Sequence, residues 1–257
     1  MTHGSALIGH TGFVGSNLDR QMRFQHRFRS TDIETIAGKC FDLVICAGVS
    51  AVKWLANQDP ERDRAGIARL IGPLQRVQAE RFVLISTVDV YPDPHAVDEA
   101  SAIDAERLAP YGRHRYELEQ FVTAHFPRVL ILRLPGLFGP GLKKNVIFDL
   151  LHGNRLEEIN PASAFQYYPL ARLARDIEAG LTANLDLANL ATEPLPTAQI
   201  HAALFAGATI GANADPSLSY DMRTRHAEAF GGSGAYVMTA ADVLTALDGF
   251  VAETRHG

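Results

Sequence analysis

Short apolar runs alternate along the chain with longer segments in which apolar residues recur every three or four positions. Such runs are typical of strands buried on both faces of a parallel sheet, and such segments of amphipathic helices. The predicted strands are 6–8, 26–29, 41–48, 81–87, 129–134 and 187–190. The predicted helices begin at 13 and cover 60–80, 111–125, 145–151, 170–181, 197–205 and 240–251. This alternation predicts an α/β fold with a doubly wound parallel sheet.

Three glycines spaced G-x-x-G-x-x-G follow the first predicted strand and lead into a helix. Gly9 permits a tight turn, Gly12 lets the backbone approach a pyrophosphate, and Gly15 lets the helix pack closely on the strand. The N–H groups and positive dipole end of that helix would face the phosphates. A plain strand–turn–helix connection is the alternative. Because the glycines follow the first predicted strand and precede a helix, they favour a dinucleotide site of Rossmann type. The loop residues expected to contact the cofactor are Gly9, Thr11, Gly12, Phe13, Val14 and Gly15.

The regular alternation loosens after a loop rich in Gly and Pro at 134–141. We therefore predict an NAD(P)-binding Rossmann core over 1–138, to which 170–205 returns. A smaller C-terminal lobe that binds the substrate is expected over 139–169 and 206–257.

Composition and charge narrow the class of protein. The chain has 257 residues and a net charge of -5, without a basic stripe, which argues against nucleic acid as a partner. No apolar run approaches the roughly 18 residues that span a membrane, and the N-terminus does not resemble a signal peptide. Cys40 and Cys46 are predicted to be buried thiols, and no metal site is expected. We predict a cytoplasmic protein.

The end of the second predicted strand bears on the choice of cofactor. A carboxylate at this position binds the ribose 2′-hydroxyl of NAD, whereas an arginine accommodates the 2′-phosphate of NADP. Arg29 lies about twenty residues after Gly9 and favours NADP, although an exposed edge-strand charge is the alternative. Asp32 is expected to flank the adenine or hold a ribose hydroxyl, so NAD remains an alternative cofactor. Ala47 and Gly48, at the end of the next strand, are also expected at the cofactor.

Tyr111 and Arg115 stand four residues apart at the start of a predicted helix and share one face, and Thr87 ends a predicted strand. In an open α/β sheet the carboxyl ends of the strands form the ligand crevice. A cation about 4 Å from the phenol contributes roughly 4 kcal/mol, enough to lower a phenol pKa of ~10 by about three units. Surface packing of this Tyr–Arg pair is the alternative. We predict that Tyr111 transfers a proton, Thr87 orients the substrate oxygen, and Arg115 supplies the cation.

Four segments carry a resemblance to a known family. They are Gly9-His10-Thr11-Gly12-Phe13-Val14-Gly15, Ile85-Ser86-Thr87-Val88-Asp89-Val90-Tyr91, Pro110-Tyr111-Gly112-Arg113-His114-Arg115 and Leu132-Arg133-Leu134-Pro135-Gly136-Leu137-Phe138-Gly139-Pro140. In this order they resemble the extended short-chain dehydrogenases/reductases, and most of all the GDP-fucose synthase and dTDP-4-dehydrorhamnose reductase types. The resemblance places the family's catalytic hydroxyl on Thr87, its tyrosine on Tyr111, and a nicotinamide contact on Pro135. Arg115 stands where the family has lysine, and arginine cannot lose its proton.

The smaller lobe is expected to hold the substrate. Lys144 and Asn145 open a predicted helix, where charge and the helix dipole suit a diphosphate. The resemblance implies that an Asn at such a place contacts the nucleotide diphosphate. A solvated helix start is the alternative. Gln166 is expected at the sugar or base, unless this region only packs, and Asp89 is also assigned to the substrate.

These observations together predict an NAD(P)-dependent reductase or epimerase of a nucleotide sugar, working by hydride transfer. Two alternatives stay open. One is a non-catalytic dinucleotide-binding sensor or scaffold, in which Arg115 has removed turnover. The other is a reductase of a non-sugar carbonyl. The resemblance also implies a homodimer formed through helices on one face of the sheet.

Overall fold

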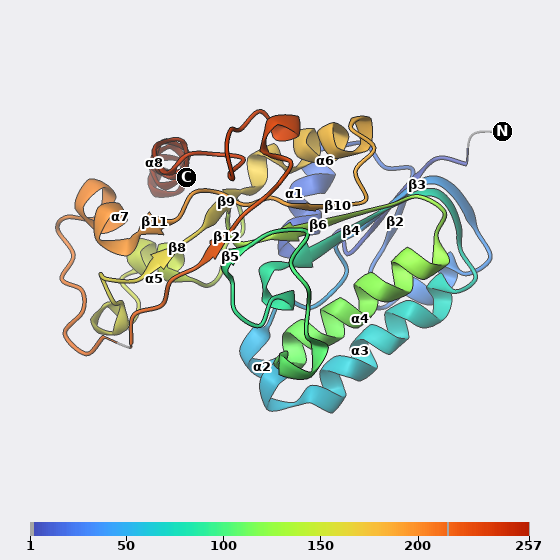
Figure 1. Cartoon of the computed structure of the whole chain (residues 1–257), viewed down its shortest axis with the longest axis horizontal. Helices are drawn as coiled ribbons and strands as arrows, with labels where there is room; N and C mark the ends of the chain where they lie inside the picture. The colour runs from blue at the N-terminus through green and yellow to red at the C-terminus, as the bar shows by residue number, and fades with distance from the viewer. Residues whose placement is uncertain (1–2, 215, 257) are drawn as a thin grey trace. The chain divides into compact units, whose positions relative to one another are not determined.

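The structure is a computed structural model that describes residues 3–214 and 216–256 (Figure 1). By compactness the chain divides into two units. Unit 1 comprises Met1–Asp93, Ala100–Arg133 and Leu173–Ala188, and unit 2 comprises Pro94–Glu99, Leu134–Arg172 and Asn189–Gly257. Of the segment 170–205 that we expected to return to the core, 173–188 lies in unit 1 and 189–205 in unit 2.

The central sheet has six strands in the order β10-β6-β4-β3-β1-β2. Their bounds are β1 Ser5–Ile8, β2 His26–Phe28, β3 Cys40–Cys46, β4 Gln78–Thr87, β6 Val129–Leu134 and β10 Leu187–Asn189. β1 pairs in parallel with β2 on one side and with β3 on the other. The chain order reverses between β1 and β3, which is the point where doubly wound sheets bind ligands. The predicted fold class is confirmed.

Helices cover both faces of this sheet (Figure 1). In unit 1 they are α1 Phe13–Gln21, α2 Lys53–Gln58, α3 Pro60–Leu74, α4 Pro110–His125 and α6 Leu173–Thr182, with the short 3-10 turns η1 Ile33–Ile36, η2 Val88–Val90 and η3 Ala105–Arg107. α3 and α4 lie side by side on one face, and α1 packs near α6 on the other. The helix predicted over 60–80 is too long. Pro73 lacks an N–H, the helix ends one residue after it, and β4 has already begun at Gln78.

The main core of unit 1 lies between the sheet and the helix pair α3–α4. Ile67 and Leu74 of α3 and Leu118 and Val122 of α4 are buried there against the apolar residues of β3 and β4. Phe82 stacks on Phe126 with ring centroids 4.3 Å apart. The apolar stripes that predict these helices are therefore the faces that hold them on the sheet.

Unit 2 is built from short elements around a core of its own. They are β5 His95–Val97, β7 Gly136–Phe138, α5 Val146–His152, η4 Leu156–Glu158, β8 Ala164–Phe165, β9 Tyr167–Pro169, η5 Leu170–Arg172, β11 Leu195–Pro196, α7 Thr197–Leu204, β12 Asp221–Met222, η6 Ala227–Phe230 and α8 Ala240–His256. The strands form three two-stranded sheets, β7–β9, β8–β11 and β5–β12. The core is made by Ile147 and Leu150 of α5, Ile200 of α7, and Val243 and Leu247 of α8. In the described part of the chain, no helix has the length and apolarity needed to cross a membrane.

Candidate cofactor and active site

The loop between β1 and α1 requires glycine at two positions. Gly9 has φ +87°, and a Cβ there would lie 2.5 Å from the carbonyl oxygen of Ala47. A Cβ on Gly15 would lie 2.1 Å from the carbonyl oxygen of Gly9. α1 begins at Phe13 with Gly12 as its N-cap, so the first N–H groups of the helix have no partner within it. The loop therefore brings β1, β3 and the N-terminus of α1 together without side chains between them.

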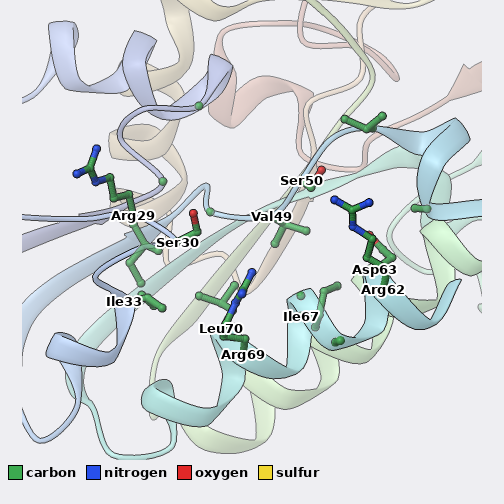
Figure 2. A pocket seen from close by; sticks show the side chains of 18 of the residues that line it. Arg29, Ser30, Ile33, Val49, Ser50, Arg62, Asp63, Ile67, Arg69 and Leu70 are labelled. Carbon is green, nitrogen blue, oxygen red and sulfur yellow. The ribbon is translucent and has the colours of Figure 1, made fainter. Parts of the chain in front are cut away.

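A cavity of about 680 Å³ opens at this loop in unit 1 (Figure 2). Six of the predicted cofactor residues line it, namely Gly9, Thr11, Gly12, Arg29, Ala47 and Gly48. Ile67 and Leu70 of α3 form the opposite wall. Phe13, Val14 and Gly15 lie in the first turn of α1. An elongated cavity between a glycine loop, a helix N-terminus and an apolar wall fits the adenosine and pyrophosphate of a nicotinamide dinucleotide.

Arginines lie along the cavity from one end to the other. Figure 2 shows Arg29 and Ser30 at one end, Arg62 and Asp63 at the other, and Arg69 rising from α3 between them. Cationic side chains of this kind suit phosphate oxygens. The cavity therefore offers its glycine loop and several guanidinium groups to an anionic ligand.

Arg29 follows β2 and is paired with Asp32. The Asp32 carboxylate accepts a hydrogen bond of 2.7 Å from the Arg29 backbone N–H, and it lies 3.5 Å from Nε of the Arg29 side chain. Asp32 does not line the cavity, whereas Arg29 does. Of the two predicted residues at this strand end, Arg29 therefore lines the cavity, and Asp32 is bonded to Arg29.

Arg115 lies on the face of the Tyr111 ring. Its guanidinium carbon is 3.8 Å from the ring centroid, and the side chain is 5% exposed. Both terminal nitrogens of Arg115 donate to the carboxylate of Asp63, one of them over 2.9 Å, and Nη2 also donates to the carbonyl of Ser50 over 2.5 Å. His114 contacts the same carboxylate at 2.8 Å. Because Asp63 and Ser50 line the cavity, they connect it to Arg115 and Tyr111.

The pKa of Tyr111 lies above its ordinary value. Burial is the main cause, and the charge of Arg115 opposes it without overcoming it. Asp89 and Asp63 raise the pKa further, and Lys53 lowers it. We predicted that a neighbouring cation lowers the pKa of Tyr111. This prediction is wrong for the chain without a ligand, because burial and the two carboxylates outweigh the cations. The phenol of Tyr111 keeps its proton at neutral pH.

Thr87 ends β4 and is bound to Asp89 two residues later. The Thr87 hydroxyl donates to Oδ2 of Asp89 over 3.2 Å, and Lys53 Nζ lies 2.5 Å from Oδ1 of the same carboxylate. Gly112 allows α4 to approach this turn, because a Cβ there would lie 1.9 Å from the Asp89 carbonyl oxygen. The Tyr111 backbone N–H donates to Oδ1 of Asn57 on α2 over 3.0 Å. The structure thus brings Thr87, Asp89 and the start of α4 together.

A second ionic cluster lies deeper, one turn further along α4. Glu119 accepts from Arg133 of β6, with Nη2 to Oε2 at 2.5 Å, and also from the hydroxyl of Ser86. Arg133 donates in turn to the Tyr91 hydroxyl over 2.8 Å. The pKa of Arg133 is raised, because the bonds to Glu119 and Tyr91 outweigh its burial. These groups fasten the end of β4 to α4 and β6.

The predicted substrate residues of unit 2 have structural partners or lie at its surface. Asn145 caps α5, accepting from Phe148 N–H over 3.1 Å and donating to the Leu137 carbonyl over 2.9 Å. Gln166 is 1% exposed, and its amide is bonded to the backbone of Thr192 and Met222. Lys144 is exposed, and Pro135 is buried. The bonds of Asn145 and Gln166 hold unit 2 together, so neither amide is turned toward a ligand in this structure.

Sequence reasoning missed the partners of the predicted catalytic groups, namely Asp63, Lys53 and Asn57. For Asp63 a signal was present. It lies four residues before Ile67 on α3, in line with the buried stripe of that helix, and a carboxylate on a buried face needs a cationic partner. Lys53 and Asn57 lie on a short helix that the pattern does not predict.

The cysteine and acidic side chains of the described residues are not grouped as metal ligands. Within residues 3–214 and 216–256, no group of three or more His, Cys, Asp or Glu is placed to hold a metal ion. Cys40 and Cys46 are free thiols. Cys46 is fully buried as predicted, whereas Cys40 is only partly buried, so the prediction of a buried thiol is wrong for Cys40. Burial raises the pKa of the Cys46 thiol to about 11, so it stays protonated at neutral pH.

Comparison with known proteins assigns the chain to a family. A model of the NAD dependent epimerase/dehydratase family matches residues 28–160, just over half of the chain, and the chain belongs to this family. This match agrees with the resemblance to the extended short-chain dehydrogenases/reductases that the four sequence motifs carry. Comparison with curated protein sequences gives no match.

Solved structures of similar fold share little sequence with this chain. A UDP-glucose 4-epimerase from Thermotoga maritima is 14% identical with a TM-score of 0.73, and 98% of each chain is covered. A dTDP-glucose 4,6-dehydratase from Streptomyces venezuelae with NAD bound is 15% identical with a TM-score of 0.76, covering 98% of this chain and 97% of its own. A dTDP-4-dehydrorhamnose reductase from Clostridium acetobutylicum is 14% identical with a TM-score of 0.72, covering 98% and 99%. These likenesses show the fold.

Proposed function

We propose that this protein is an NAD(P)-dependent enzyme that reduces or epimerises a nucleotide-activated sugar, with Tyr111 as its acid/base. The observation that carries the proposal is the connection between cavity and phenol. Asp63 and Ser50 line the space that fits a dinucleotide, and both are bonded to Arg115, which lies on the Tyr111 ring. Proton transfer beside a bound nicotinamide needs this proximity. The substrate class follows from the family and from the nucleotide-sugar enzymes of the same fold.

Each residue of the site has a distinct proposed role. A bound nicotinamide dinucleotide would supply or accept the hydride. Tyr111 is in its protonated form at neutral pH and can donate this proton to a carbonyl oxygen, which favours the direction of reduction. The Thr87 hydroxyl orients that oxygen. Arg115 fixes the ring of Tyr111 through its stacked guanidinium.

The cofactor proposed is NADP, because Arg29 lines the cavity where the strand β2 ends, and Asp32 does not. An arginine at this place accommodates a 2′-phosphate, and Asp32 is engaged with the backbone of Arg29 rather than turned to a ribose. NADH should therefore bind more weakly than NADPH.

The experiment is NADPH oxidation by the purified chain with a panel of 4-keto nucleotide sugars at neutral pH. Tyr111→Phe should lower kcat on the order of 10²- to 10⁴-fold, because the proton donor is removed. Tyr116→Phe, on the same helix, is the matched control and should keep parental turnover. Binding is followed separately through quenching of Trp54, the only tryptophan, which precedes the cavity residue Leu55.

The second candidate function is a dinucleotide sensor without turnover, favoured by the replacement of the family lysine with Arg115. NADPH binding without reduction or epimerisation of any panel member, unchanged in Arg115→Lys, would support the sensor and refute the enzyme.

A further inference from the structure

Two arginines on α3 line the cavity without serving the fold. Arg62 and Arg69 belong to the wall that α3 forms, and both are exposed. In the part of the chain that the structure describes, neither guanidinium group forms an ion pair or a hydrogen bond. Arg64 lies between them in the sequence, but it does not line the cavity and is paired with Glu117 of α4 over 2.8 Å. Arg62 and Arg69 therefore keep their N–H donors for a ligand or for water.

The spacing of these two arginines places them on the same face of α3. Seven residues make close to two turns, so their Cα atoms lie about 10 Å apart along the helix axis. Gly66 lies between them, about one turn from each, and also lines the cavity. A Cβ on Gly66 would meet no other heavy atom of the described chain within 4 Å. This face of α3 therefore offers two cations with open space between them.

The two carboxylates of the same wall are bonded to other groups. Oδ1 of Asp59 accepts the backbone N–H of Arg62 over 3.1 Å at the start of α3. The Asp63 carboxylate is bonded to Arg115 and His114. A guanidinium binds a phosphate best when no carboxylate of the protein competes for its donors. The charges of the two arginines are therefore available to an anion in the cavity.

The two ends of the cavity differ in what they adjoin. Asp63 and Arg62 lie at one end (Figure 2), and Arg115 connects Asp63 to the ring of Tyr111. Under the proposed function, this end belongs to the nicotinamide half of the coenzyme, since the proton donor must lie beside the reacting ring. Arg29 lies at the other end, which is left for the adenosine half and its 2′-phosphate.

Arg69 lies toward the adenosine end of α3. Its neighbour Leu70 belongs to the same core cluster as Ile33, which follows Arg29 by four residues. Figure 2 shows Arg69 rising from α3 between the two ends of the cavity. A phosphate monoester carries up to two negative charges and three acceptor oxygens. Arg29 and Arg69 come from different elements, so both can bind one such group at the same time.

We propose that Arg69 binds the 2′-phosphate of NADPH together with Arg29, and that Arg62 binds the pyrophosphate from the side opposite the glycine loop. This inference rests on the proposed function and adds two residues that determine how the coenzyme is held. Arg69 then contributes to the preference for NADPH over NADH. Arg62 acts on both coenzymes alike, because both carry the pyrophosphate.

The test of Arg69 compares Arg69→Met with Arg64→Met, the matched control on the same helix. In Arg69→Met the Kd for NADPH, followed by Trp54 quenching, should rise about tenfold, while the Kd for NADH stays parental. Calorimetry with 2′,5′-ADP and 5′-AMP, which differ only in the 2′-phosphate, should show a loss of about tenfold for 2′,5′-ADP alone. Arg64→Met should keep parental values throughout.

A structural role of Arg69 would weaken all four ligands alike and would leave the preference for NADPH unchanged. Equal losses of this kind, or a parental Kd for NADPH and 2′,5′-ADP in Arg69→Met, would overturn the role of Arg69. A loss as large in Arg64→Met would show that any cation of α3 has this effect, and would overturn it as well.

Arg62→Met should raise the Kd for NADPH and for NADH by the same factor, about tenfold. Parental Kd values in this variant, or a loss confined to NADPH, would overturn the role of Arg62. These outcomes leave the proposed function intact. A parent chain that binds neither coenzyme, or binds NADH as tightly as NADPH, would instead overturn the proposed use of NADPH, and this inference with it.

Discussion

Two buried Arg–carboxylate clusters lie one turn apart on the same face of α4, and they differ in what surrounds them. In the upper cluster, Arg115 pairs with Asp63, which lines the cavity. In the lower cluster, Glu119 pairs with Arg133, and its further contacts are to side chains of the core. Both clusters bury charge almost completely, yet only the upper one borders ligand space. A buried Arg–carboxylate pair can therefore form part of a ligand site, as in the upper cluster, or only stabilise the fold, as in the lower cluster.

The energetics of burial explain why each of the two arginines has a carboxylate partner. A buried charge without its partner costs several kcal/mol, whereas a paired and hydrogen-bonded one is tolerated. Removing one member of either cluster should destabilise the protein. Only the upper cluster should also change the affinity for the dinucleotide.

The largest effect is expected for Glu119→Ala in the lower cluster. It leaves the Arg133 guanidinium buried without its carboxylate, and the free energy of unfolding should fall by about 3–5 kcal/mol. Urea unfolding measures this. The control is Glu117→Ala, whose partner Arg64 is exposed, and it should cost about 0–1 kcal/mol. A loss as small as that of the control would show that the lower cluster does not hold the fold.

The next effect sharpens the contrast between the clusters. Arg115→Met removes the guanidinium from Asp63 and leaves the carboxylate with His114 alone at the cavity wall, where it would repel the phosphates of a dinucleotide. The Kd for NADPH should rise on the order of 100-fold, or about 2.7 kcal/mol. Trp54 quenching measures it at a temperature where the variant is folded. Glu119→Ala, measured alike, should keep parental affinity, and equal losses in both variants would remove the distinction between the clusters.

A smaller effect is expected at the far end of the cavity. Arg29→Ala should raise the Kd for NADPH about tenfold, or about 1.4 kcal/mol, because a charged partner of the 2′-phosphate is lost. The Kd for NADH should not change. Arg27→Ala, two residues earlier on β2 and paired with Asp19, is the control. A parallel loss for both coenzymes would argue against NADP.

The smallest effect is a pH dependence of stability from the upper cluster. The bonds from Arg115 and His114 outweigh burial and hold the pKa of Asp63 below its ordinary value of 3.8. A lowered folded-state pKa means that the stabilisation is present above pH 3.8 and is lost as pH falls through the folded value. The free energy of unfolding should therefore decline below about pH 4, and less steeply in Asp63→Asn. If the free energy of unfolding declines with pH equally in the parent and in Asp63→Asn, Asp63 is excluded as a source of the pH dependence.

Much of the fold could be predicted because local pattern and tertiary role coincide. The run Val129–Leu134 is apolar enough to be a buried strand, and β6 has these bounds. Gly9 and Gly15 could be assigned because a turn and a close approach need them, and the structure shows both contacts. The end of the helix predicted over 60–80 was wrong. Val77 continues the apolar spacing of the helix although it lies between α3 and β4, and apolar spacing alone does not show where a helix ends.

The ionic partners could not be predicted because they join distant parts of the chain. Arg115 meets Asp63 from 52 positions away, and Lys53 meets Asp89 from 36. The sequence pattern does contain one member of each of the two buried Arg–carboxylate pairs. Asp63 lies in the apolar stripe of α3, and Arg133 within an apolar strand. A charge inside a buried pattern indicates that a partner exists, but only the packing of α3, α4 and β6 identifies it.

The most direct test of the account follows deuterium from C4 of reduced nicotinamide into a 4-keto nucleotide sugar, in the parent chain and in Tyr111→Phe. We expect the parent to place the label on the sugar carbon that carried the carbonyl, and Tyr111→Phe to slow this transfer on the order of 10²- to 10⁴-fold. A parent chain that binds NADPH and transfers no label, or a Tyr111→Phe chain that transfers it at the parental rate, would contradict the account.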